Sequence, residues 1–179
     1  MKKIMFLAIM MTIAISANAM TYNAARNEAL FLSDKMAYEL GLTNAQYEAV
    51  YEINLDYLLN VNTRADVHGP WWNIRNRDLR HVLSTWQYDR YMSSHYFFRP
   101  IAFRAGTWTL AIYNRYDRGR MFMHRPAVFA GFRGGHNHRG VSFYASNNFH
   151  KPAPRNGGHN HRPPMHNGRP SHHHPGGHR

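Results

Sequence analysis

The sequence predicts an α+β fold: a small, mostly helical domain of three to four helices, then a short β-hairpin or small sheet, then a disordered tail. Three observations support this prediction. Apolar residues recur at steps of three and four through the first half of the chain, which is typical of amphipathic helices. The period changes to two after Pro100, as in β-strands. From Arg133 onward the chain is rich in His, Gly, Pro and Arg and contains no Leu or Ile.

Residues 1–19 have the features of a secretory signal peptide. An apolar run of 12 residues from Ile4 to Ile15 follows two lysines, and Ala17-Asn18-Ala19 is a small-x-small cleavage site. A buried N-terminal helix would leave both flanking features unexplained. The run is too short to span a bilayer, which needs about 20 residues. We therefore expect cleavage after Ala19, a periplasmic or secreted mature chain, and no transmembrane segment in it.

Three helical segments are expected next. Residues 24–40 and 44–60 carry apolar side chains at helical spacing, and Gly41 between them is a natural C-terminal stop. Pro70 suits the first turn of a third helix, whose apolar stripe extends to Trp86. The third segment counts as one helix or two, depending on whether it breaks near its middle.

A helix-capping motif occurs twice. Leu42-Thr43-x-x-Gln46 places a hydroxyl at the N-cap and, three residues on, a glutamine that can reach back to the N–H of the cap. Leu83-Ser84-x-x-Gln87 repeats this pattern 41 residues later, again followed by Tyr and an acidic residue. We interpret the pair as a weak internal repeat of two helix–break–helix units. No glycine precedes the second copy, so the helix either breaks there or continues through it.

These paired motifs in a small secreted helical protein resemble the LTxxQ family of periplasmic chaperones and stress regulators, the Spy and CpxP type, over about residues 24–96. The resemblance implies helices that form a cradle-shaped dimer and shelter unfolded envelope polypeptides. The alternative is that each motif only starts a helix. The chain also looks similar to uncharacterised secreted proteins of Bacteroidetes with a helical front and a Gly/His tail, a resemblance that implies no activity.

A β-hairpin is expected after the helices. Ile101–Arg104 and Thr107–Tyr113, joined by Ala105-Gly106, have the alternation of two strands around a short turn. Met121–Met123 and Ala127–Ala130 are candidates for one or two further strands. A lone hairpin is marginal in water, so it should pack on the helices or pair with these strands. The many aromatic side chains are either core or, where exposed, a surface for polypeptide or glycan.

The charge is unevenly distributed along the chain. The formal net charge of the chain is +12. Residues 20–117 contribute nothing to it, because they contain ten basic and ten acidic residues. Residues 118–179 contain ten basic residues, no acidic residue and 11 of the 14 histidines. We place the domain at 20–132 and a disordered tail at 133–179, because the tail lacks the apolar surface that offsets the entropy of ordering. Val141–Tyr144 is a local exception that either docks as a short strand or stays exposed.

The tail carries the best candidate chemistry. The hexapeptide Gly134–Arg139 recurs as Gly157–Arg162, and neutral imidazole binds Zn, Ni and Cu. Without fixed geometry or carboxylates this predicts loose buffering of several divalent ions, which fails as the rings protonate near pH ~6.5. The alternative is a solvating tail with incidental metal affinity. The candidate ligands are His136, His138, His150, His159, His161, His166, His172, His173, His174 and His178.

The same tail is a candidate anion-binding segment. Its basic residues are almost all Arg, which is suited to bidentate contact with phosphate or carboxylate. Because the signal peptide places the chain outside the cytoplasm, we expect anionic envelope polymers (lipopolysaccharide, acidic glycan or extracellular DNA) rather than cytoplasmic nucleic acid. The candidate residues are Arg133, Arg139, Arg155, Arg162, Arg169 and Arg179.

The sequence contains no motif of a known catalytic class. The chain has no Cys, which excludes disulfides, thiolate zinc sites and cysteine nucleophiles. It also lacks Gly-x-Ser-x-Gly, a phosphate loop and His-Glu-x-x-His. Asp78 and His81 are either a metal pair or a solvated helical ion pair. We expect a non-enzymatic binding protein whose tail buffers divalent metal while the domain shelters unfolded polypeptide. The alternative is an envelope structural protein whose basic tail binds anionic polymers.

Overall fold

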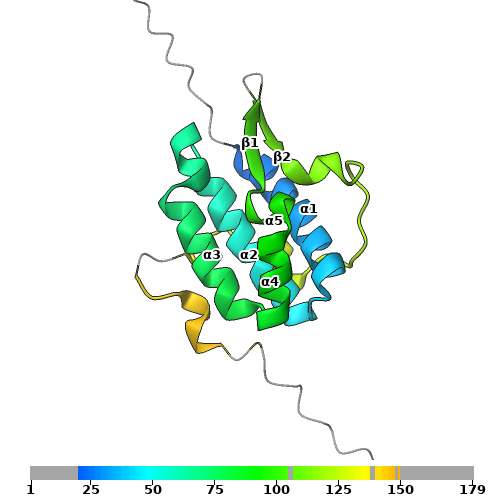
Figure 1. Cartoon of the computed structure of the whole chain (residues 1–179), viewed down its shortest axis with the longest axis vertical. Helices are drawn as coiled ribbons and strands as arrows, with labels where there is room; N and C mark the ends of the chain where they lie inside the picture. The colour runs from blue at the N-terminus through cyan, green and yellow to red at the C-terminus, as the bar shows by residue number, and fades with distance from the viewer. Residues whose placement is uncertain (1–19, 105–106, 138–139, 148, 150–179) are drawn as a thin grey trace, which may run out of the picture.

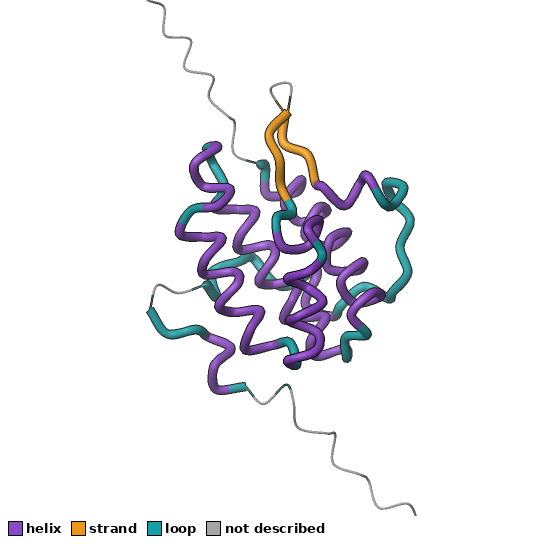
Figure 2. Tube along the Cα trace, viewed as in Figure 1, coloured by secondary structure: helices purple, strands orange, loops and turns teal. Residues whose placement is uncertain are grey.

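Five α-helices and a two-stranded antiparallel sheet make up the described part of the chain (Figures 1 and 2). The computed structural model describes residues 20–104, 107–137, 140–147 and 149. The prediction of a mostly helical α+β domain is confirmed, although five helices stand where three or four were expected. The predicted signal peptide lies outside the described residues.

The first two helices pack against each other. α1 covers Tyr22–Leu40 and packs along α2, which covers Asn44–Asn60. Gly41 between them has φ +61°, a left-handed conformation that glycine adopts without strain. Residues 29–37 of α1 are buried without interruption. The amphipathic pattern expected for this helix is therefore wrong in its middle, because other segments cover the side that α2 leaves open.

Three shorter helices follow a 3₁₀ turn. α3 covers Pro70–Val82, α4 covers Thr85–Ser93 and α5 covers His95–Phe98. The helix is interrupted between α3 and α4, so the second capping motif starts a new helix and does not lie inside a continuous one. Because of this interruption, Trp86 does not continue the apolar stripe of the third helix, as was expected. Its side chain is 58% exposed.

The hairpin forms, but with a shorter second strand than expected. β1 covers Ile101–Arg104 and pairs antiparallel with β2, which covers Thr107–Leu110. The chain then turns into a 3₁₀ helix, η2, at Ala111–Asn114. The further strands expected at Met121–Met123 and Ala127–Ala130 are not formed: the first is a loop and the second contains a 3₁₀ helix, η3.

The packed domain extends past the predicted boundary at residue 132. Residues 133–137 and 140–147 are described, and Asn137 and Tyr144 are buried at 6% and 1% exposure. Val141–Tyr144 docks through a 3₁₀ helix, η4 (Phe143–Ser146), which packs on α3, and not as a strand. The domain boundary at 132 is too early, because this segment finds hydrogen-bond partners on α2. The rest of the predicted tail, from residue 150, lies outside the described residues.

Candidate functional site

Both predicted capping boxes are present. The Thr43 hydroxyl accepts from the Gln46 N–H at 3.2 Å, and the Gln46 side chain accepts from the Thr43 N–H at 3.0 Å. Ser84 and Gln87 repeat this geometry, with distances of 3.3 and 2.9 Å. The leucines of the two motifs, Leu42 and Leu83, are buried.

The two glutamines also join the motifs to each other. The Gln46 amide nitrogen donates to Gln87 Oε1 at 2.7 Å and to the carbonyl of Val82, at the end of α3, at 2.9 Å. In return the Gln87 amide nitrogen donates to Gln46 Oε1 at 3.2 Å and to the carbonyl of Leu40, at the end of α1, at 3.2 Å. Because both glutamines are buried, the paired motifs are an internal joint between helix ends rather than an exposed binding site.

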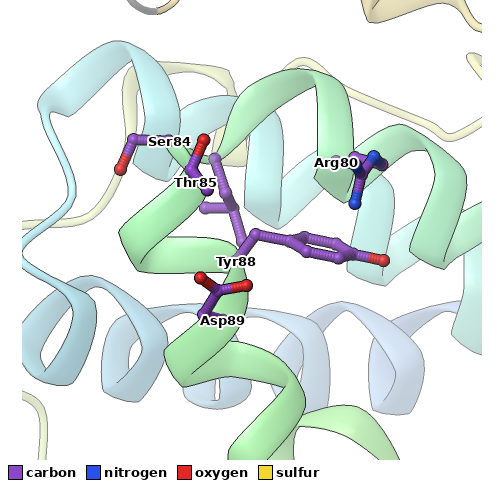
Figure 3. A pocket seen from close by; sticks show the side chains of 6 residues that line it. Arg80, Ser84, Thr85, Tyr88 and Asp89 are labelled. Carbon is purple, nitrogen blue, oxygen red and sulfur yellow. The ribbon is translucent and has the colours of Figure 1, made fainter.

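A cavity of about 390 Å³ opens beside the second motif (Figure 3). The Arg80 guanidinium lies 5.3 Å from the centre of the Tyr88 ring, and the Asp89 side chain lines the same cavity. The Ser84 hydroxyl, also in the lining, is already an acceptor in the cap. Since an arginine and an aspartate both line it, the cavity favours neither anions nor cations.

The first predicted metal ligand, His136, is engaged in docking the chain onto α2. Its Nδ1 lies 3.0 Å from Glu52 Oε2, and its ring stacks on Phe143 with centroids 4.0 Å apart. The same carboxylate oxygen accepts from the Tyr144 hydroxyl at 3.1 Å. No cluster of three metal-ligating side chains occurs within the described ranges. The other candidate ligands lie outside them: His138, His150, His159, His161, His166, His172, His173, His174 and His178.

Asp56 holds the backbone on either side of His136. Its carboxylate accepts from the N–H of Gly135 and, at 2.8 Å, from that of Asn137. Burial raises the pKa of Asp56, and these N–H donors act in the opposite direction. Gly134 has φ +92°, and a Cβ there would lie 2.8 Å from Asp56 Oδ1. The described part of the first hexapeptide copy, residues 134–137, is therefore shaped by its contacts with α2.

The other charged candidates are only partly described. Arg133 donates to the Tyr22 hydroxyl at 3.1 Å and to the Ala130 carbonyl at 2.8 Å. Asp78 is buried and pairs with Arg77, while His81 is exposed. The remaining anion-binding candidates lie outside the described residues: Arg139, Arg155, Arg162, Arg169 and Arg179.

A second cationic segment, unforeseen as a site from sequence, crosses the outer side of α1. We call residues 115–125 the arginine loop, since Arg115, Arg118, Arg120 and Arg125 lie in it. All four are exposed, and the loop contains a single acid, Asp117. Figure 1 shows this part of the chain as a long loop between η2 and η3.

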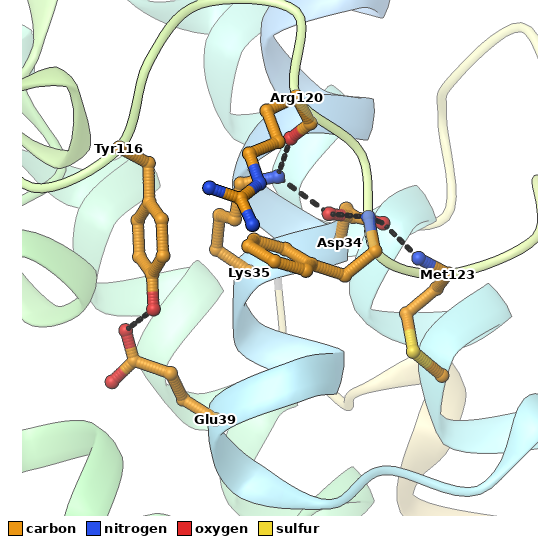
Figure 4. A network of polar contacts seen from close by, with 7 residues as sticks. Asp34, Lys35, Glu39, Tyr116, Arg120 and Met123 are labelled. Carbon is orange, nitrogen blue, oxygen red and sulfur yellow. Dashed lines mark hydrogen bonds and ion pairs between the residues drawn. The ribbon is translucent and has the colours of Figure 1, made fainter.

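A buried ion pair on α1 fixes the arginine loop (Figure 4). Asp34 accepts from the backbone N–H of Phe122, at 3.0 and 3.1 Å from its two oxygens, and from that of Met123 at 2.7 Å. Lys35 Nζ lies 2.6 Å from Asp34 Oδ2 and donates to the Arg120 carbonyl. Both side chains are fully buried. The charges are compensated by each other and by the loop backbone, as buried charges require.

Aromatic rings surround the ammonium group of this pair. Lys35 Nζ lies 4.2 Å from the centre of the Phe31 ring and 4.5 Å from that of Phe122. The Phe122 ring in turn stacks on Tyr38, with the ring centroids 4.4 Å apart. Cation–π attraction in a desolvated setting adds to the ion pair.

Glu39, one turn further along α1, holds the start of the loop. Its carboxylate accepts from the hydroxyls of Tyr96 and Tyr116, each at 2.7 Å, and pairs with Arg115 at 3.1 Å. Burial, followed by the hydrogen bond to Glu39, raises the pKa of both tyrosines. They therefore remain neutral donors at ordinary pH.

The loop arginines rest on aromatic rings. The guanidinium carbon of Arg118 lies 3.9 Å from the centre of the Tyr113 ring, and those of Arg120 and Arg125 lie 5.2 and 4.7 Å from the Phe122 and Phe129 rings. Within the described part of the chain, no carboxylate pairs with these three arginines. Stacking occupies one face of a guanidinium and leaves its N–H edges available to an anion.

The acidic side chains of α1 and α2 point toward the rest of the fold. Six of them accept hydrogen bonds from residues after position 95: Glu28, Asp34, Glu39, Glu48, Glu52 and Asp56. Their charge is used inside the molecule, which leaves the arginine loop with few competing anions. In the sequence the only signal of this surface is the interleaving of Arg with Tyr and Phe between 113 and 122, without a helical or strand period.

None of the described helices has the length and apolar character of a membrane span. No model of a known protein family matches the chain, and comparison with curated proteins and with solved structures likewise finds no match.

Proposed function

We propose that this protein binds anionic polymers through the arginine loop. The observation that carries the proposal is a set of exposed arginines that rest on aromatic rings and lack carboxylate partners among the described residues, on a backbone fixed by the buried Asp34–Lys35 pair. The predicted export of the chain would bring it into contact with acidic glycans and the phosphates of lipopolysaccharide. The anion-binding hypothesis thus moves from the tail alone to the folded domain.

The physical basis is preorganisation. An arginine that already rests on a ring loses less side-chain entropy on binding than a freely rotating one. Its planar fork matches carboxylate, sulfate and phosphate groups. Several such groups along one loop can follow a polymer and release its counterions, which gives an affinity that falls with salt.

Replacing three loop arginines should weaken this binding. We expect Arg118→Gln, Arg120→Gln and Arg125→Gln together to lower affinity for heparin, used as a model polyanion, roughly 10–100-fold at low salt. The slope of log K against log salt should fall by about 2, because up to three anion contacts are lost. Calorimetric titration of the full chain at several salt concentrations measures both quantities.

The chain offers a matched control for this experiment. Arg64, Arg80 and Arg90 are also exposed and lie 4.8–5.3 Å from aromatic ring centres, but they belong to other elements. Their triple replacement by Gln removes the same formal charge. An equal loss of affinity in the control would contradict a localised site and indicate that net charge alone governs binding.

We propose metal buffering as a separate function of residues 150–179. Eight of the ten predicted ligands lie there, whereas His136 is engaged with Glu52. Sheltering of unfolded polypeptide, which the family resemblance implies, would need a surface other than the buried glutamine joint.

Metal uptake should depend on these eight histidines. We expect the full chain to take up Zn, Ni or Cu with micromolar affinity at pH above ~6.5 and to lose uptake when all eight are replaced by Gln. Equilibrium dialysis with metal analysis at pH 7.5 and 5.5 measures this. Undiminished uptake by the substituted chain would exclude the segment as the metal-binding part.

A further inference from the structure

A cavity of about 690 Å³ lies between the hairpin, α5 and the 3₁₀ turns that flank them. Its volume is within the range of small-molecule sites. Three of its polar lining residues carry or can carry positive charge: His68 in η1 (Arg64–His68), His95 in α5 and Arg99 directly after α5. No acidic residue is in the lining.

The segments that carry the three basic groups are tied together through the backbone and through Trp72. The Arg99 N–H donates to the His95 carbonyl at 2.8 Å, so these two residues are one helical turn apart. The His68 ring packs edge-on against Trp72, whose indole N–H donates to the Phe98 carbonyl at 2.8 Å. The turn that holds His68 and the helix that holds His95 are thereby tied together.

Three groups that carry or can carry positive charge line this cavity. Burial lowers the pKa of His68, and the nearby Arg99 and His95 lower it further. The Arg99 guanidinium has no hydrogen-bond partner or ion-pair partner within the described residues. An anion bound between these groups would favour protonation of the histidines and would accept hydrogen bonds from the imidazole and guanidinium N–H groups.

The rest of the lining points to a small, hydroxylated ligand. Ile101 and Leu110, paired across the hairpin, give a buried apolar floor. Thr109 and Asn114 add a hydroxyl and an amide group that can bond to ligand hydroxyls. A sugar ring with one acidic substituent has the chemistry that this lining can bind.

We propose that this cavity binds a small acidic carbohydrate, with its carboxylate or phosphate at His68, His95 and Arg99 and its hydroxyls at Thr109 and Asn114. The site is separate from the arginine loop and does not depend on polymer binding there. It holds one ligand of defined size, whereas the loop tracks a repeating charge.

The test is a titration of the full chain, followed by calorimetry and by NMR of the histidine rings, with three probes. Glucuronate and glucose 6-phosphate distinguish a carboxylate from a phosphate, and glucose lacks the anion. We expect saturable one-to-one binding of at least one acidic sugar, at least tenfold weaker binding of glucose, and shifts of the His68 and His95 ring signals. Absence of binding by both acidic sugars would overturn the proposal.

Two variants and one control locate the site. Arg99→Gln should weaken binding of the acidic sugar at least tenfold, and Ala102→Phe should abolish it by filling the cavity without changing charge. Arg90→Gln, which removes an exposed arginine on α4, should leave it unchanged. Equal losses in R99Q and R90Q, or undiminished binding in A102F, would show that the sugar binds elsewhere.

Discussion

Replacement of Asp34 by alanine should lower the free energy of unfolding by about 3–5 kcal/mol, because it leaves a buried charge without its partner. The fully buried Lys35 ammonium would lose its counter-charge, and the N–H groups of Phe122 and Met123 would lose their acceptor. Urea unfolding followed by circular dichroism measures this change.

Exposed acids provide the comparison for this variant. Asp89→Ala and Asp117→Ala remove the same charge from the surface, where substitutions usually change stability by less than about 0.5 kcal/mol. A loss below about 1 kcal/mol in D34A would mean that the ion pair contributes little and that the arginine loop is held by its aromatic contacts instead.

Replacement of Gln46 by leucine should destabilise the chain by about 2–3 kcal/mol, because several buried polar groups lose a partner at once. The Thr43 N–H, the Val82 carbonyl and Gln87 Oε1 all bond to the Gln46 side chain. Equilibrium unfolding of Q46L is the direct measurement.

A double-mutant cycle with Gln87→Leu separates the cap from the joint. The two glutamines bond to each other, so the double variant should lose about 0.5–3 kcal/mol less than the sum of the single losses. Thr43→Ala with Ser84→Ala is the matched cycle, since each hydroxyl serves only its own cap. Additive losses in the glutamine cycle would contradict an energetic joint between the motifs.

The parts of the fold that were predictable from sequence are the local ones. The capping boxes at Thr43 and Ser84 depend on residues three apart, and the glycine stop after α1 on one residue. Because the residues of each pattern are close in sequence, their contacts do not depend on the rest of the fold. The patterns therefore predicted the helix ends within a residue or two. The contact between Gln46 and Gln87, 41 residues apart, has no such local signature.

The burial of Lys35 could not be predicted for the same reason. A lysine among charged neighbours on a helix normally faces water. Here its partners Arg120 and Phe122 come from a loop more than eighty residues away. The arginine loop could not be predicted as a site for the same reason. The composition of the sequence points to the His- and Arg-rich end of the chain, whereas the arginine loop becomes a site only because the chain crosses one particular face of α1.

The inward-facing carboxylates also have a consequence for the order in which the chain folds. They find their partners 57 to 92 residues away, as in Glu39 with Tyr96 and Glu52 with Tyr144. Closing loops of this length costs entropy before any hydrogen bond forms, so such contacts are slow to arise. The pairing of α1 with α2 needs only the short turn at Gly41 and can come first. It would then present a row of carboxylate acceptors to which the later segments of the chain can bind.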